Sequence, residues 1–151
     1  MSYERLLVLL SRAMMPLLII QFLTGTYVSL FTVFPASSST VNPLEQIFTN
    51  GLLLLAAHVV LGFIILLIGI ALLALGAFLR QRLSLLLASF GLVAILISIL
   101  TGMAFVLGGY SDNTLSYLMS VGFIFSIAIY GSIAGTANTS LGFGKGGDSA
   151  S

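Results

Sequence analysis

The chain has 151 residues, of which 59% are hydrophobic and only 6% are charged. Charged residues make up about 25% of ordinary soluble domains, so this composition excludes a soluble globular domain and indicates an integral membrane protein. Because there is no cysteine, disulfide bonds, thiolate metal sites and thiol catalysis are excluded as well. The formal net charge of +1 gives no sign of nucleic-acid binding.

A helix that crosses a bilayer needs about 20 mostly apolar residues. We predict an all-α integral membrane four-helix bundle that forms one transmembrane domain over 1–141, followed by a flexible cytoplasmic tail at 142–151. The short connections at 80–82 and 109–113 make successive helices antiparallel neighbours, in an up-down-up-down order. The four apolar stretches lie at about 6–34, 51–79, 83–108 and 114–135.

The basic residues fall on one side of this four-pass topology, whereas the loops on the opposite side carry only Glu45 and Asp112. The positive-inside rule therefore places both termini in the cytoplasm and predicts a multi-pass protein of the cell membrane. Residues 35–50 and 109–113 then face outward. The basic residues are Arg5, Arg12, Arg80, Arg82 and Lys145.

His58 is the only histidine of the chain, and it lies in the second apolar stretch, 51–79, where no other residue is ionisable. A titratable ring inside a membrane is costly and therefore marks a functional site. Neutral imidazole can ligate a metal, bind heme iron, relay a proton or hydrogen-bond to a neighbouring helix. The sequence leaves these four roles open.

Glycines follow His58 at intervals of seven residues, at Gly62, Gly69 and Gly76. Seven residues are two helical turns, so the three glycines share one face with the histidine. Gly62 and Gly69 are expected to clear a slot for a flat macrocycle below the imidazole. The same stripe also suits close helix packing or a homodimer contact.

Two short segments recur along the chain. Residues 23–25, Leu-Thr-Gly, recur at 100–102, and His58-x3-Gly62-Phe63 has a counterpart in Leu118-x3-Gly122-Phe123. These matches predict that the chain consists of two copies of one helical pair, a parallel duplication of the kind found in some membrane folds.

A macrocycle needs its second axial ligand from another helix, and without a second histidine or a cysteine the known types left are methionine and tyrosine. His58 lies about seven residues, or roughly 10 Å, below the outer end of its helix. Met103 and Met119 lie at a matching depth. Met119 ranks first, because the repeat places it one position from the equivalent of His58. Methionine also fills ordinary packing gaps, and a five-coordinate histidine site stays open.

The most polar patch of the first helix comprises Gln21, Thr24, Gly25 and Tyr27. Gln21 and Gly25 share a face, on which the glycine permits close approach and the amide can bond to a neighbour or to a cofactor. In the fourth helix, Phe123 follows Met119 by one turn and suits the edge of a heme or a quinone ring. Interhelical hydrogen bonding and packing are the simpler uses of these residues.

Gln21-x3-Gly25, followed by His58 with Gly62 four residues on, resembles one four-helix half of heme A synthase. In that family, paired four-helix bundles hold b-type heme through histidines on even-numbered helices. The chain is also similar to small four-helix bacterial and archaeal membrane proteins of largely unknown function, through His58-x3-Gly62 and residues 101–105. Two features depart from the synthase pattern: the fourth helix has no histidine, and Ser98 replaces the second glutamine. The resemblance implies that His58 is a heme ligand but does not imply hydroxylation chemistry.

The expected function is that of a membrane-embedded b-type heme protein for electron transfer or for redox and gas sensing, rather than a stand-alone enzyme. The expected cofactor site comprises His58 and Met119 as metal ligands with Met103, Gly62, Gly25, Gln21, Tyr27 and Phe123 around them. One alternative is an accessory subunit of a larger membrane complex, in which His58 bonds to a partner. Another is a module that binds quinone or lipid.

Overall fold

The computed structural model describes residues 2–32 and 53–142. Within them the chain forms four helices and no strand, which confirms the all-α prediction. Each helix is long and apolar enough to cross a membrane: the shortest has 26 residues, or about 39 Å, against a hydrocarbon core of about 30 Å. The helices are α1 (Tyr3–Phe31), α3 (Leu53–Phe78), α4 (Arg82–Leu107) and α5 (Asn113–Gly142).

The helix ends differ from the predicted ones mainly at α1 and α5. α1 begins at Tyr3, because the Ser2 hydroxyl oxygen accepts a hydrogen bond from the Arg5 backbone N–H at 3.4 Å and so caps the first turn. α5 continues to Gly142, beyond the predicted end at 135. The outward loop at 35–50 and residues 143–151 of the predicted tail lie outside the described residues.

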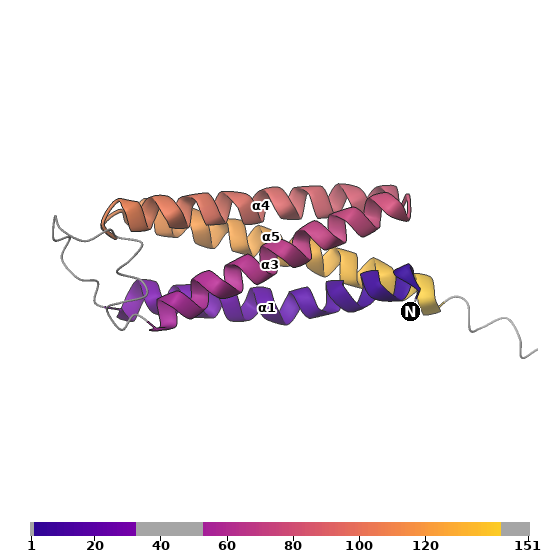
Figure 1. The fold of residues 1–151 in the computed structure, drawn as a ribbon, viewed down its shortest axis with the longest axis horizontal. Coiled ribbons are helices and arrows are strands. Elements are labelled where there is room, and N and C mark those ends of the chain that lie inside the picture. The colour runs from indigo at the N-terminus through magenta and orange to yellow at the C-terminus, as the bar shows by residue number, and fades with distance from the viewer. Residues whose placement is uncertain (1, 33–52, 143–151) are drawn as a thin grey trace, which may run out of the picture.

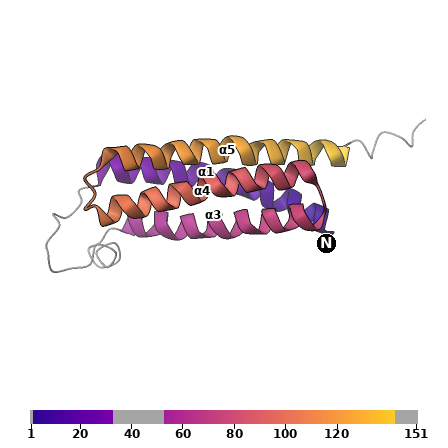
Figure 2. The ribbon, with the colours of Figure 1, turned by 90° about the horizontal axis from the view of Figure 1, so that it is seen from above.

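The four helices pack as a ring. α1 contacts α3 and α5, and α4 contacts the same two helices. Figures 1 and 2 show that the N-terminus and the connection between α3 and α4 lie at one end of the bundle, while the connection between α4 and α5 lies at the other. We call these ends the Arg80 end and the Tyr110 end.

Both short connections close with the same backbone pattern. The Gln81 N–H donates to Gly76 O at 3.2 Å, and the Tyr110 N–H donates to Phe105 O at 3.0 Å. These six-residue bonds, with Arg80 and Gly109 in the left-handed region at φ 53° and 72°, are Schellman motifs that end a helix and reverse the chain. The predicted tight turns at 80–82 and 109–113 therefore have a defined geometry.

The glycine stripe of α3 points into the bundle. A Cβ added at Gly69 would lie 3.0 Å from the Tyr130 hydroxyl oxygen, and one at Gly76 would lie 3.1 Å from the backbone nitrogen of Leu85. Since all three glycines are buried, the stripe lets α3 approach its neighbours α1 and α4 closely and accommodates the Tyr130 side chain from α5. It is not available as the homodimer surface considered above.

The expected macrocycle slot along this stripe does not extend to Gly69. There Tyr130 of α5 takes the space that the glycine leaves. At Gly62 a Cβ would lie 3.2 Å from the Gln21 amide nitrogen, but this glycine still borders open space in the bundle.

Candidate functional site

A cavity of about 390 Å³ lies in the half of the bundle near the Tyr110 end and is lined by residues of all four helices. Its size is within the range of about 300–1,000 Å³ typical of small-molecule sites. Seven of the predicted site residues line it, including His58, Met103 and Met119, which the sequence places at a matching depth. They are Gln21, Gly25, His58, Gly62, Met103, Met119 and Phe123.

Tyr27 is the predicted site residue that the structure does not bring to the cavity. Its side chain is 54% exposed, and its ring lies 5.1 Å from that of Phe31, centroid to centroid. It lines a separate shallow groove between α1 and α3 instead. The placement of Tyr27 in the site was therefore wrong.

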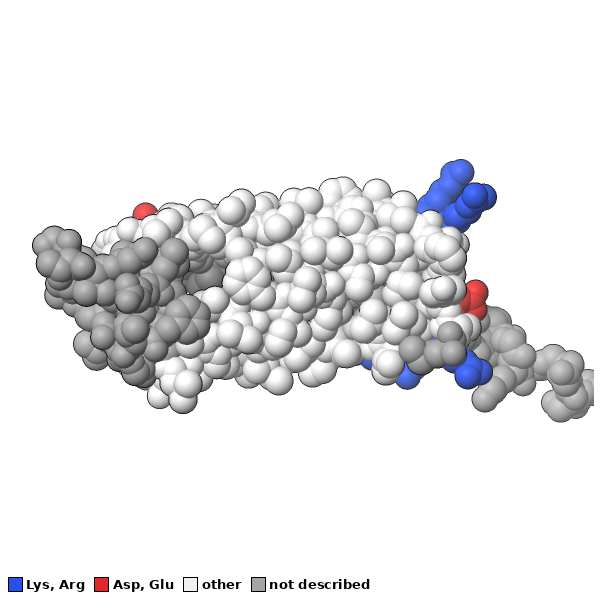
Figure 3. Space-filling model, viewed as in Figure 1, with Lys and Arg blue, Asp and Glu red and all other residues white. Residues whose placement is uncertain are grey.

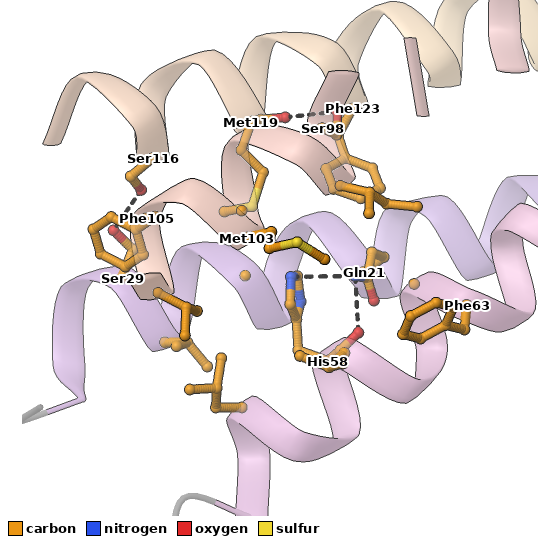
Figure 4. A pocket seen from close by; sticks show the side chains of 18 residues that line it. Gln21, Ser29, His58, Phe63, Ser98, Met103, Phe105, Ser116, Met119 and Phe123 are labelled. Atoms are coloured by element: carbon orange, nitrogen blue, oxygen red, sulfur yellow. Dashed lines mark hydrogen bonds between the residues drawn. The ribbon is translucent and has the colours of Figure 1, made fainter. Parts of the chain in front are cut away.

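His58 is held at both ring nitrogens by side chains of α1, and Figure 4 shows its contacts with Gln21. Its Nδ1 lies 3.2 Å from the Thr24 hydroxyl oxygen, and its Nε2 lies 3.2 Å from the amide nitrogen of Gln21. Gly25 makes room for the ring, since a Cβ there would lie 2.7 Å from His58 Cε1. The edge of the ring faces Phe123 at a centroid distance of 6.4 Å.

The hydrogen-bond partners assign the tautomer of the imidazole. The Thr24 hydroxyl donates to a carbonyl of its own helix, Ile20 O at 2.9 Å or Gln21 O at 3.1 Å. Its oxygen therefore accepts the Nδ1–H of His58, and the Nε2 lone pair accepts from the Gln21 amide. A neutral imidazole with its proton held at Nδ1 and its lone pair on Nε2 is a form that metal-ligating histidines adopt.

The Gln21 side chain is 2% exposed, and only one end of its amide is satisfied. The amide nitrogen donates to the backbone oxygen of His58 at 3.0 Å as well as to His58 Nε2. Its Oε1 is buried and has no partner. A buried acceptor without a partner costs about 1–3 kcal/mol, so this oxygen marks a place for a hydrogen-bond donor.

The two helical pairs repeat the same contacts around the cavity. In the first pair, the Gln21 amide donates to His58 O at 3.0 Å. In the second, the Ser98 hydroxyl lies within hydrogen-bond distance of Met119 O at 3.2 Å and of Ala94 O in its own helix at 3.0 Å, and it donates to one of the two. Thr24 and Thr101 bond back to their own helices in the same pattern.

The glycines follow the same repeat. Gly25 faces the His58 ring and Gly102 faces the Met119 sulfur at 3.0 Å, while Gly62 faces Gln21 and Gly122 faces Ser98. These paired contacts support the predicted duplication of one helical pair. Met119 consequently takes the place that His58 has in the first pair, on the opposite side of the cavity (Figure 4).

The cavity reaches the surface of the bundle at α3 and α4. Phe63 on α3 and Met103 on α4 both line it, and their side chains are 54% and 45% exposed. Both residues lie within helices that are long and apolar enough to span a bilayer. The exposed side of the cavity is therefore apolar.

Several residues of the site were not predicted. Thr24 was predicted only as a member of the polar patch of the first helix. It lies three residues after Gln21 and one turn before Val28, and this spacing was the available signal that it lies near the site. Ser29 and Ser116 share a hydrogen bond of 2.9 Å between α1 and α5, and Phe105 closes the cavity beside them. Nothing in the sequence distinguishes these serines from the other serines of the helices.

No family model, characterised protein or solved structure matches this chain. Within the described residues, no three His, Cys, Asp or Glu side chains cluster as a metal site. The donors that surround the cavity are one imidazole, one amide, hydroxyls and two thioethers. What this cavity can bind follows from those groups.

Proposed function

We propose that the chain is a membrane protein that binds one b-type heme in this cavity, for electron transfer or for redox and gas sensing. His58 would hold the heme iron, and Met119 would hold it from the opposite helical pair. The observation that carries the proposal is the orientation of His58: Thr24 holds Nδ1, so Nε2 carries the lone pair. That lone pair is paired with the Gln21 amide, beside a cavity that Met119 enters from the other side.

The donor set fits a heme on one condition. Imidazole with thioether is a known axial pair, and a hydroxyl at Nδ1 is the outer-shell partner that orients such a histidine. The condition is that Gln21 gives up its bond to Nε2, which leaves its bond to His58 O in place. At about 390 Å³ the cavity is at the small end of ligand sites, so a heme would also need the exposed side of the cavity, where Phe63 and Met103 lie. When bound, heme supplies one-electron redox chemistry and a site for diatomic gases.

We further propose four antiparallel spans with both termini in the cytoplasm. Figure 3 displays basic side chains at the Arg80 end and only an acidic one among the described residues at the opposite end. The basic residues of the described chain are Arg5, Arg12, Arg80 and Arg82, and the acidic residue of the Tyr110 end is Asp112. The positive-inside rule makes the Arg80 end cytoplasmic, so the cavity lies in the outer half of the membrane.

An absorption spectrum tests heme binding. Protein expressed with an adequate heme supply and purified in detergent should show a Soret band, and His58→Ala should lose it, because no other histidine can replace the ligand. Met14→Leu is the matched control, since Met14 is a buried methionine that does not line the cavity. A colourless wild-type protein contradicts the proposal, and if it co-purifies with other membrane proteins it favours the accessory-subunit role.

Substitution of Met119 tests the second ligand. Met119→His should convert the site to bis-histidine ligation and lower the midpoint potential, because a methionine ligand raises the potential of heme iron. Met119→Leu should retain the Soret band but become five-coordinate and high-spin. Met103→Leu, which changes the other thioether of the cavity, should leave both spectrum and potential close to those of the wild type. Equal effects of the two leucine variants would rule out Met119 as the specific ligand.

The second candidate function, binding of a membrane quinone, is favoured by the unpartnered Gln21 Oε1. A hydroquinone hydroxyl can donate to this oxygen, and Phe63, Phe105 and Phe123 line the same cavity with aromatic surface. Native mass spectrometry separates the candidates, because it would detect either a heme or a quinone mass on the folded chain. A quinone mass on a colourless protein favours this second function.

A further inference from the structure

Gln21 makes two hydrogen bonds to His58 from a single nitrogen. Its amide reaches the His58 backbone oxygen at 3.0 Å and the ring Nε2 at 3.2 Å. The first bond ties α1 to α3. The second bond occupies the lone pair of Nε2, the only ring nitrogen without a proton. A metal would need this lone pair to bind His58.

The orientation of the amide is fixed by His58. If the amide were turned over, its oxygen would face the His58 backbone oxygen, and two acceptors would oppose each other without a proton between them. The observed orientation avoids that repulsion but leaves Oε1 buried without a partner. Gly62 provides the room, since a Cβ there would lie 3.2 Å from the amide nitrogen.

The second helical pair has the backbone tie without the cap. The Ser98 hydroxyl lies 3.2 Å from Met119 O, as the Gln21 amide lies near His58 O, but it has a single proton, which it gives either to Met119 O or to Ala94 O at 3.0 Å. Its side chain is also shorter than that of glutamine. It therefore leaves the thioether of Met119 uncapped. The longer side chain of glutamine therefore allows a hydrogen bond to the His58 ring that has no counterpart at Met119.

We infer that Gln21 is a latch on His58, a positioning residue that holds the Nε2 lone pair in the ligand-free protein and must release it before any metal can bind there. The tie to the His58 backbone keeps the amide in place during release, so the latch opens by a small rotation of the side chain. A donor that enters the cavity and pairs with Oε1 favours the open state. The inference rests on the proposed function only for the identity of the group that replaces the latch.

The chain offers a direct readout, because it has one histidine. In ligand-free protein labelled with ¹⁵N-histidine, the two ring signals should report a protonated Nδ1 and an unprotonated, hydrogen-bonded Nε2. Gln21→Leu should move the Nε2 signal toward that of a free lone pair and leave Nδ1 in place. A wild-type ring protonated at Nε2 would overturn the latch, with no variant needed.

Chemical modification measures the release. Diethyl pyrocarbonate acylates an unprotonated imidazole nitrogen, and the mass shift of the single histidine gives the rate. In ligand-free protein Gln21→Leu should react about 2- to 13-fold faster than the wild type, the factor that corresponds to one neutral hydrogen bond. Ser98→Ala is the matched control, since it removes the equivalent tie in the second pair and should leave the rate unchanged.

Heme titration of the ligand-free protein completes the test. Gln21→Leu should bind heme more tightly than the wild type by a factor similar to its gain in reaction rate, because the competing bond is gone. Unchanged modification rates in a folded Gln21→Leu variant would overturn the latch, as would weaker heme binding together with a slower rate. The NMR and modification experiments need no heme, so failure of the proposed function and failure of the latch are separately visible.

Discussion

Gly91→Ala is expected to destabilise the bundle by about 2 kcal/mol. A Cβ at this position would lie 2.6 Å from Tyr130 Cε2 and 2.8 Å from Cζ, far inside van der Waals contact. Tyr130 is fully buried, and Gly69 confines its hydroxyl end from α3. The ring therefore has no free space into which it can move. Overpacking costs about 1–3 kcal/mol, and this site belongs at the upper end.

The helix propensity of alanine offsets part of that cost. Alanine is favoured over glycine by about 1 kcal/mol in a helix interior, which leaves a net loss of about 2 kcal/mol. Gly135→Ala isolates the propensity gain, because a Cβ there has no atom within 4 Å. It should be neutral or slightly stabilising. The measurement is reversible unfolding in mixed detergent micelles, followed by circular dichroism.

A double substitution checks the mechanism. Tyr130→Leu removes the part of the ring that would meet the new methyl group, so Gly91→Ala should cost less in that background than in the wild type. Residues in contact show coupling free energies of about 0.5–3 kcal/mol, and we expect a favourable value in this range. Additive effects of the two substitutions would show that Tyr130 is not the obstacle.

The helices themselves were predictable, because in a bilayer the length of an apolar run determines a span almost directly. The end of α5 was not. The prediction stopped at 135, where a more polar segment that includes Thr136 and Asn138 begins, yet the helix continues to Gly142. Polar residues mark where a helix leaves the apolar phase, whereas backbone hydrogen bonds decide where it ends.

The depth of the site was predictable from helical rise, and this is why His58, Met103 and Met119 line one cavity. The side of the helix on which a residue lies was harder to predict, because residues that are close in sequence can lie on opposite sides. Tyr27 follows Gly25 by two residues, which is about 200° around the helix. It therefore lies away from the cavity, although it belongs to the same polar patch. Its angle around the helix axis, rather than its closeness to Gly25 in sequence, would have excluded Tyr27 from the site.

The roles of the glycines could not be predicted, because they depend on which side chain of another helix fills each gap. Gly62 accommodates the Gln21 amide and Gly25 accommodates the His58 ring. A glycine that makes room for a cofactor and one that makes room for a protein side chain look the same in a sequence. The pairing of Gln21 with His58 joins residues 37 positions apart, and no local pattern contains that register.

Gly25→Ala is expected to abolish ligand binding at His58 while the four helices still form. The added Cβ would lie 2.7 Å from His58 Cε1 and 3.4 Å from each ring nitrogen. The imidazole must therefore leave its place between Thr24 and Gln21, and the bonds of 3.2 Å that orient it are lost. We expect at least a tenfold loss of heme affinity, the factor that corresponds to about 1.4 kcal/mol.

Gly102→Ala is the matched variant in the second helical pair. A Cβ there would meet only the Met119 sulfur, at 3.0 Å, and a flexible thioether can move aside where a hydrogen-bonded ring cannot. Gly102→Ala should therefore retain the Soret band and change only its ligation-sensitive features, whereas Gly25→Ala should lose the band. Circular dichroism should report the same helix content in both. A Gly25→Ala protein that kept the wild-type spectrum would mean that heme is held elsewhere, because the crowding at Gly25 acts on His58 alone.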